Sequence, residues 1–127
     1  MIIPTEAQEQ TTLFQWAAMM SRFYQELALM HAIPNGGSRN PIEARNLRLQ
    51  GVRAGIPDIC LPCARNGFHG LYIELKRQKG GRVSVDQKKM LLALNEQGYK
   101  AVVCNGWEEA KNVIEEYMNE RTMQGMH

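Results

Sequence analysis

The segment PDICLPCARNGFHGLYIELK, residues 57–76, contains two short apolar runs separated by turn residues. In its second half, apolar side chains at 71, 73 and 75 alternate with Tyr72, Glu74 and Lys76. Successive side chains of a strand point to opposite faces, so Glu74 and Lys76 are predicted to share a face. The first run, 59–61, follows Asp58 directly. If the two predicted strands pair, Asp58, Glu74 and Lys76 meet at one place.

These three residue types favour a metal site. Carboxylate oxygens from Asp58 and Glu74 are the ligands that a hard cation such as Mg²⁺ takes. A lysine beside them, Lys76, can orient a water or neutralise a developing negative charge. The alternative from the residues alone is structural: Asp58 caps a turn, and Glu74 and Lys76 form a solvated pair on a strand.

The whole chain has the size and composition of one globular domain. It has 127 residues, of which 44% are hydrophobic and 22% are charged. We expect a single domain over residues 1–120 and a disordered tail over 121–127. No apolar run approaches the length of a membrane helix, and residues 1–6 lack the pattern of a signal peptide. The chain is therefore expected to act without a membrane.

Three cysteines, an odd number, argue against a secreted disulfide framework. Cys60 and Cys63 form a Cys-x-x-Cys pair, but further zinc ligands are scarce, and the pair follows a predicted strand rather than a helix N-terminus. All three cysteines are therefore interpreted as reduced thiols. An intracellular, cytoplasmic location follows.

The net charge of +2 is unevenly distributed along the chain. Residues 39–100 carry twelve Lys and Arg against five Asp and Glu, a local charge of +7, whereas the segments before and after carry −2 and −3. The excess positive charge lies in the same stretch as Asp58, Glu74 and Lys76. A polyanion is the natural partner for such a segment. A solvated basic surface without a ligand is the alternative.

Helical and extended patterns alternate along the chain, which predicts an α/β fold with a small mixed β-sheet flanked by helices. Capping residues support two helix starts, at Asn40-Pro41 and at the capping box Ser84–Gln87. The predicted helices cover 6 to about 24, 40–51, 84–98 and 107 to about 119. The predicted strands cover 27–33, 59–61, 71–76 and 99–104, with a basic loop at 79–82.

With these elements in place, the chain resembles the VRR-NUC (virus-type replication-repair nuclease) family of the PD-(D/E)xK nuclease superfamily, which has a restriction-endonuclease-like core. The resemblance covers roughly residues 6–118. Its motifs stand in family order, and any one of them alone is weak. They are Glu9-Gln10 before Leu13-Phe14-Gln15-Trp16-Ala17, then Ile33-Pro34-Asn35-Gly36-Gly37, Gly51-Val52-Arg53-Ala54-Gly55-Ile56-Pro57-Asp58, Glu74-Leu75-Lys76, Gln87 and Gly98-Tyr99.

The resemblance implies a Mg²⁺- or Mn²⁺-dependent DNA endonuclease of the DNA-repair type, in a bacterial or phage-infected cell. It implies that Asp58, Glu74 and the backbone carbonyl of Leu75 hold the metal. Lys76 would position or activate the attacking water, and Glu9 would approach the metal from the first helix. Stand-alone members resemble Holliday-junction resolvases, so the resemblance also implies a homodimer and a four-way or branched DNA substrate.

Several assignments stay open at the level of sequence. Glu6 competes with Glu9 for the helix-borne role, because both lie on the Leu13 face and suit a helix N-terminus. Gln87 either supports the site or is only the capping partner of Ser84. A larger set of polar and basic residues is predicted to contact DNA phosphates, with ordinary surface charge as the alternative. That set is Asn35, Arg39, Arg53, Lys79 and Arg82. A non-catalytic basic module that binds DNA or a partner protein is the alternative function.

Overall fold

A computed structural model describes residues 2–34 and 40–119 of the chain. Its elements alternate as predicted, with four α-helices, one 3-10 helix and four strands in these ranges. In chain order they are α1 (Glu6–Met20), η1 (Gln25–Leu29), β1 (His31–Ala32), α2 (Pro41–Leu49), β2 (Ile59–Leu61), β3 (Leu71–Lys76), α3 (Val85–Glu96), β4 (Lys100–Asn105) and α4 (Trp107–Asn119). Within the described ranges, no helix is long and apolar enough to cross a bilayer.

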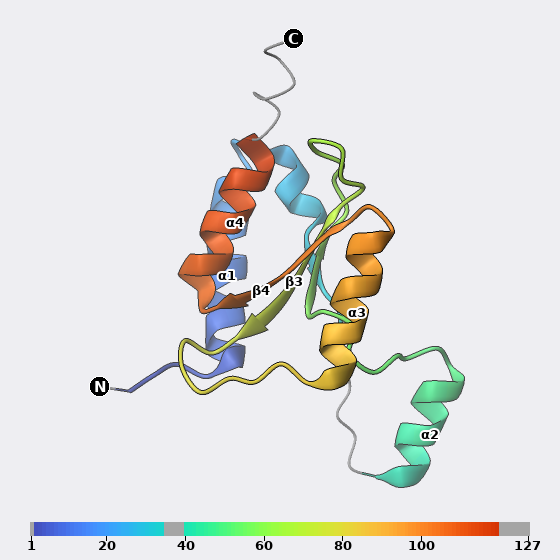
Figure 1. Ribbon diagram of the computed structural model, residues 1–127. Coiled ribbons are helices and arrows are strands. Elements are labelled where there is room, and N and C mark those ends of the chain that lie inside the picture. Colours follow the sequence, from blue (N-terminus) through green and yellow to red (C-terminus); the bar gives the residue numbers. More distant parts are fainter. Residues whose placement is uncertain (1, 35–39, 120–127) are drawn as a thin grey trace.

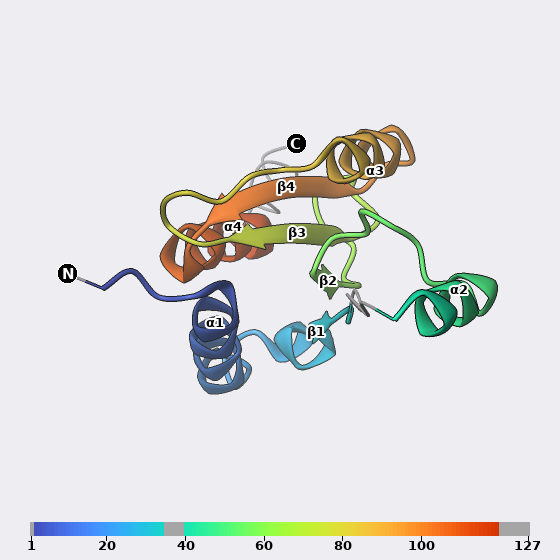
Figure 2. The same cartoon turned by 90° about the horizontal axis from the view of Figure 1, so that it is seen from below.

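The four strands form one mixed sheet in the order β1-β2-β3-β4. Strands β1, β2 and β3 pair antiparallel, with Ile59 opposite Ile73, and β4 runs parallel to β3, with Glu74 opposite Val103. The parallel return requires a crossover, which α3 supplies between β3 and β4. Figure 2 shows the strands side by side, with α1 near β1 and α3 beside β4. The predicted α/β class and mixed sheet are confirmed.

The turn between β2 and β3 has the residues that its backbone requires. Asn66 and Gly67 both have positive φ, 51° and 86°, a conformation that Asn and Gly tolerate best. On either side of them, Arg65 and Phe68 exchange both backbone hydrogen bonds, at 3.1 and 2.8 Å. The turn returns the chain so that β2 and β3 pair antiparallel with Ile59 opposite Ile73, which brings Asp58 and Glu74 to adjacent positions.

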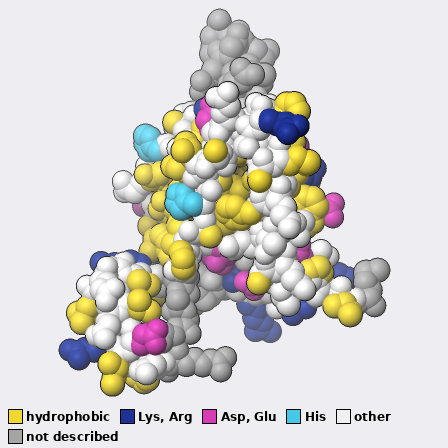
Figure 3. Space-filling view, turned by 180° about the vertical axis from the view of Figure 1, so that it is seen from behind, with side chains coloured by type: hydrophobic (Ala, Val, Ile, Leu, Met, Phe, Trp, Pro, Cys, Tyr) yellow, Lys and Arg dark blue, Asp and Glu magenta, His cyan; other side chains and the backbone are white. Residues whose placement is uncertain are grey.

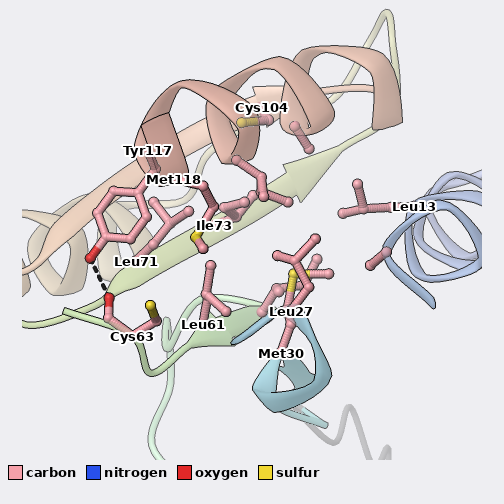
Figure 4. Packing of buried hydrophobic residues seen from close by; sticks show 14 of the residues in the cluster. Leu13, Leu27, Met30, Leu61, Cys63, Leu71, Ile73, Cys104, Tyr117 and Met118 are labelled. Atoms are coloured by element: carbon pink, nitrogen blue, oxygen red, sulfur yellow. Dashed lines mark hydrogen bonds between the residues drawn. The ribbon is translucent and has the colours of Figure 1, made fainter. Parts of the chain in front are cut away.

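The core lies on the face of β3 that carries Leu71, Ile73 and Leu75, against α1 and α4 (Figure 4). Tyr117 of α4 is fully buried, and its hydroxyl donates a hydrogen bond of 2.6 Å to the carbonyl of Cys63. All three cysteines fall in the described ranges and are free thiols, as predicted. Burial raises the pKa of the Cys104 thiol to about 12, so this cysteine stays protonated and unreactive.

Two predicted boundaries near the N-terminus are wrong. The first helix ends at Met20 rather than near Tyr24, and Phe23 is 71% exposed. The predicted strand over 27–33 is mostly the 3-10 helix η1, and only His31–Ala32 is a strand. The cause is a series of i→i+3 bonds, such as Leu27 N–H to the Tyr24 carbonyl at 3.0 Å, which bury Leu27 without extending the chain. A short apolar run does not distinguish these two outcomes.

Helix α2 projects from the rest of the molecule (Figures 1 and 3). All nine of its residues are described, and none is buried. Its start is the predicted one: the Asn40 side chain accepts hydrogen bonds from the backbone N–H groups of Ile42 and Glu43, and Pro41 is the first helical residue. Gly51, with φ +104°, follows its end. The predicted tail over 121–127 lies outside the described residues.

Candidate active site

Strand β3 places Glu74 and Lys76 on the face opposite the core, where α3 and the loop before β2 cover them. Both side chains are buried, with Glu74 2% and Lys76 7% exposed. Neither is therefore part of a solvated strand pair, which was the alternative from sequence. Two charged side chains at this depth need partners, because burial penalises an unpaired charge.

The partners hold one Glu74 oxygen and leave the other free of donors. Oε2 lies 3.3 Å from the Lys76 ammonium Nζ and accepts a hydrogen bond of 3.1 Å from Gln87 Nε2. Oε1 is buried and, among the described residues, has no hydrogen-bond partner. A buried carboxylate oxygen without a donor is costly in the metal-free protein, because its desolvation is uncompensated.

Asp58 meets the same strand from β2. It is half-buried, and its Oδ2 accepts a hydrogen bond of 2.8 Å from the backbone N–H of Leu75, between Glu74 and Lys76. The sequence prediction that Asp58, Glu74 and Lys76 meet at one place is confirmed by these contacts. Burial raises the pKa of Glu74 to about 7, the neighbouring Asp58 carboxylate adds to the rise, and Lys76 opposes it.

These observations fit a divalent cation. The two carboxylates repel each other, the Glu74 oxygen lacks a donor, and a hard cation bound between Asp58 and Glu74 would relieve both conditions. Across residues 2–34 and 40–119, however, no three His, Cys, Asp or Glu side chains are grouped closely enough to hold a metal ion. Two carboxylate side chains thus stand together, and the further ligand that the family resemblance implies is the backbone carbonyl of Leu75.

Gln87 makes the capping contacts predicted from the sequence and also contacts Glu74. Its Oε1 accepts a hydrogen bond of 2.8 Å from the Ser84 backbone N–H, and its own N–H donates to Ser84 Oγ at 3.1 Å, which completes the capping box. Its Nε2 meanwhile donates to Glu74. Because the cap takes the amide oxygen, the amide nitrogen must face the carboxylate. The cap of α3 therefore orients Gln87 toward Glu74.

Gly55 connects the Asp58 loop to the same helix end. Its φ is +83°, and a Cβ added there would lie 2.5 Å from the carbonyl carbon of Asp86, which is closer than real contacts allow. The backbone before Asp58 thus packs directly on the first turn of α3, one residue before Gln87. This contact was not identified from the sequence. A glycine two residues before Pro57-Asp58 was the available signal.

Glu9 is buried as predicted, but its observed contact is elsewhere. It is 1% exposed, and its Oε1 accepts a hydrogen bond of 3.1 Å from the backbone N–H of Trp107, the first residue of α4. A carboxylate at this position is stabilised by the positive end of the helix dipole. Its Oε2 is buried and has no partner in the described part of the chain. The structure does not group Glu9 with Asp58 and Glu74, so its metal role stays a prediction. Its rival Glu6 is exposed.

The three described members of the predicted DNA-contacting set lie in loops. Arg53, in the loop before β2, and Lys79 and Arg82, in the loop after β3, are exposed. Each of these loops adjoins a strand that carries the site. Asn35 and Arg39 lie outside the described residues. Exposed arginines and lysines around a buried acidic centre suit a polyanion that approaches the carboxylates.

A mixed sheet that presents Asp58 and the Glu74-Leu75-Lys76 unit from adjacent strands defines a nuclease-type α/β domain. The sequence model of the VRR-NUC domain matches residues 2–108, and the chain belongs to this family. A solved structure described as a "VRR_NUC domain protein" is similar, with a TM-score of 0.79 and 29% sequence identity. The similarity covers 92% of this chain and 90% of that one. No curated protein matches the chain.

Proposed function

We propose that this VRR-NUC domain is a DNA endonuclease that depends on Mg²⁺ or Mn²⁺. The observation that carries the proposal is the pair of neighbouring carboxylates Asp58 and Glu74, in which Glu74 has one oxygen held by two donors and the other buried without any. A binding module has no need for such an arrangement, because two mutually repelling carboxylates weaken binding to a polyanion.

Each residue has a distinct task in this proposal. Asp58 and Glu74 hold the cation, and the Leu75 carbonyl joins them. The chemistry that a bound Mg²⁺ or Mn²⁺ supplies is a water of lowered pKa and shielding of the charge on the phosphate. Lys76 keeps its ammonium group beside Glu74, where it orients the attacking water and offsets the negative charge of the reacting phosphate. Gln87 is a positioning residue that fixes the orientation of Glu74.

The decisive experiment replaces one proposed metal ligand and leaves the exposed basic residues unchanged. Asp58→Ala, and separately Glu74→Gln, are expected to reduce Mg²⁺- or Mn²⁺-dependent cleavage of labelled DNA to background, because either change removes a ligand. DNA binding in EDTA is expected to stay within about threefold, since base contacts and phosphate contacts outside the metal site remain. The only other aspartate, the exposed Asp86, provides the matched control Asp86→Asn, which is expected to cleave normally.

Two outcomes separate the alternatives. Undiminished cutting by Asp58→Ala would rule out the proposed site. DNA binding by the parent protein with no cleavage under any divalent cation would favour the non-catalytic module instead. Calorimetric titration with Mn²⁺ gives a readout besides activity, because Glu74→Gln should lose the metal-binding heat while Asp86→Asn retains it.

The resemblance to Holliday-junction resolvases supports two finer proposals, a homodimer and a preference for branched DNA such as a four-way junction. Two sites in one particle could cut opposed strands of a junction. Light scattering during active turnover checks the assembly, and a single species of 14.5 kDa that retains activity would count against the dimer. Competition between a labelled four-way junction, a flap and a duplex of equal length checks the preference.

A further inference from the structure

A hollow of about 320 Å³ lies beside the candidate site. We call it the Val52 hollow. Its walls are apolar side chains from the end of the β1 segment and from the loop before β2, and its polar lining comes from Gln50 and Arg53. The apolar lining residues are Ile33, Pro34, Val52 and Ile56. Its volume is at the lower end of the range for small-ligand pockets.

Backbone contacts place the Val52 hollow next to the proposed metal ligand. The N–H of Ile33 donates a hydrogen bond of 2.7 Å to the carbonyl of Asp58, so one wall is bonded to the residue that carries the carboxylate. Ile56, on another wall, precedes Asp58 by two residues. A group bound in the hollow therefore lies beside the backbone of Asp58.

The chemistry of the lining selects the kind of ligand. Aliphatic walls do not bind phosphate, whose contacts in proteins come from cations, hydroxyls and backbone N–H groups. They do suit the flat face of a nucleobase, and Gln50 and Arg53 can bond to its polar edge or to the phosphate attached to it. A base within a paired duplex is stacked and does not reach such a hollow, whereas an unpaired base does.

We propose that the Val52 hollow binds one unpaired base of the DNA strand whose neighbouring phosphate lies at Asp58 and Glu74. This inference rests on the proposed function, because it takes the phosphate at that site to belong to DNA. It gives the domain a preference for DNA with an unpaired nucleotide next to the cut, which a flap and a bulge contain and a fully paired duplex or four-way junction lacks. The preference then has a local origin and does not require a dimer.

The test measures binding in EDTA, so that no cleavage occurs. The probe is a duplex with one unpaired 2-aminopurine, whose fluorescence reports on its surroundings, and the reference is the same duplex fully paired. Val52→Phe fills the hollow and is expected to weaken binding of the unpaired probe about tenfold, which is typical of losing one base contact, while leaving the paired duplex unchanged. Leu49→Phe, at a 74% exposed position three residues earlier, is the matched control and is expected to bind both as the parent does.

A change on the DNA side keeps the test valid if Val52→Phe fails to fold. An abasic site in place of the unpaired base removes the proposed ligand without altering the protein, and it is also expected to cost about tenfold in affinity. Equal affinity of the parent for the abasic and base-containing probes would overturn the inference. That result is independent of the cleavage assay, where normal cutting by Asp58→Ala would instead overturn the nuclease assignment.

Discussion

Helices α4 and α2 are held in place by different means. α4 buries Ala110, Ile114, Tyr117 and Met118 against the sheet, whereas α2 buries nothing and is defined by its caps. A nine-residue helix without burial is marginal on its own, because most helical stability in proteins comes from packing. We therefore distinguish a packed body, formed by α1, α3, α4 and strands β2–β4, from an arm, α2.

The difference shows where the candidate site obtains its rigidity. Glu74 and Lys76 lie on a strand of the body, and Gln87 lies on a capped helix of the body. Asp58 ends the loop that leads back from the arm, and Gly55 in that loop packs on α3. The loop thus joins a rigid region to one that can move at little cost. The Val52 hollow lies between them.

The largest expected difference is in global stability. Ile114→Ala in the body is expected to lower the free energy of unfolding by about 2–5 kcal/mol, because a fully buried side chain is lost. Leu49→Ala on the arm removes a side chain that is 74% exposed and is expected to change it by less than about 0.5 kcal/mol. Urea unfolding followed by circular dichroism measures both. Equal losses would mean that the arm packs on the body in solution.

A second expected effect is confined to the body and depends on pH. The pKa of Glu74 is about 7 in the folded protein and near 4.5 in the unfolded chain, so the folded state binds this proton more tightly. In EDTA, the contribution of Glu74 to the free energy of unfolding is therefore largest below about pH 4.5. It falls as the pH rises toward 7, by about 3 kcal/mol in total.

Chemical unfolding at several pH values, with and without Glu74→Gln, isolates this contribution. The variant is expected to lose the decline between about pH 5 and 7, because its side chain does not titrate. Glu43→Gln on the arm is the matched control and should leave the decline in place, since Glu43 is exposed. A parent profile that rises over the same interval would contradict the stated environment of Glu74.

The smallest expected effect concerns the two helix caps. Asn40→Ala removes the cap of the arm and is expected to raise amide exchange in α2 about fivefold, which corresponds to a cap of about 1 kcal/mol. Global stability should hardly change, because no residue of α2 is fully buried. Ser84→Ala removes the cap of α3, and there the loss of about 1 kcal/mol is expected in global unfolding as well. A loss of about 1 kcal/mol in the free energy of global unfolding from Asn40→Ala would show that the arm unfolds together with the body.

Elements whose pattern is local were predictable from the sequence. Strand β3 follows from strict alternation and α2 from Asn40-Pro41. The meeting of Asp58, Glu74 and Lys76 followed from that alternation on the condition that the two strands pair, which they do. These features need only neighbouring residues and backbone geometry.

Features that depend on distant contacts were not predictable. The segment Gln25–Leu29 packs Leu27 into the core against residues of other elements, which its short apolar run does not reveal. The partner of Glu9 is a backbone N–H 98 positions away in sequence, and no periodicity points to it. The complete burial of Glu74 also depends on residues distant in sequence, among them Asp58 and Gln87, that cover its face of the sheet. The alternation in β3 predicted that Glu74 and Lys76 share a face of the strand, but not that this face is buried.

The contact between Glu9 and Trp107 also has a consequence for synthesis of the protein. α1 leaves the ribosome well before α4, yet its buried carboxylate and its packing surface are completed only by α4. Bringing such distant segments together loses chain entropy before any contact repays it. The body is therefore expected to form late and nearly at once, after β4 and α4 have emerged. Until then, the apolar face of α1 is available to chaperones. Limited proteolysis of ribosome-bound chains tests this order of events. Chains arrested before Trp107 should be digested, whereas chains in which α4 has fully left the ribosome should resist the protease.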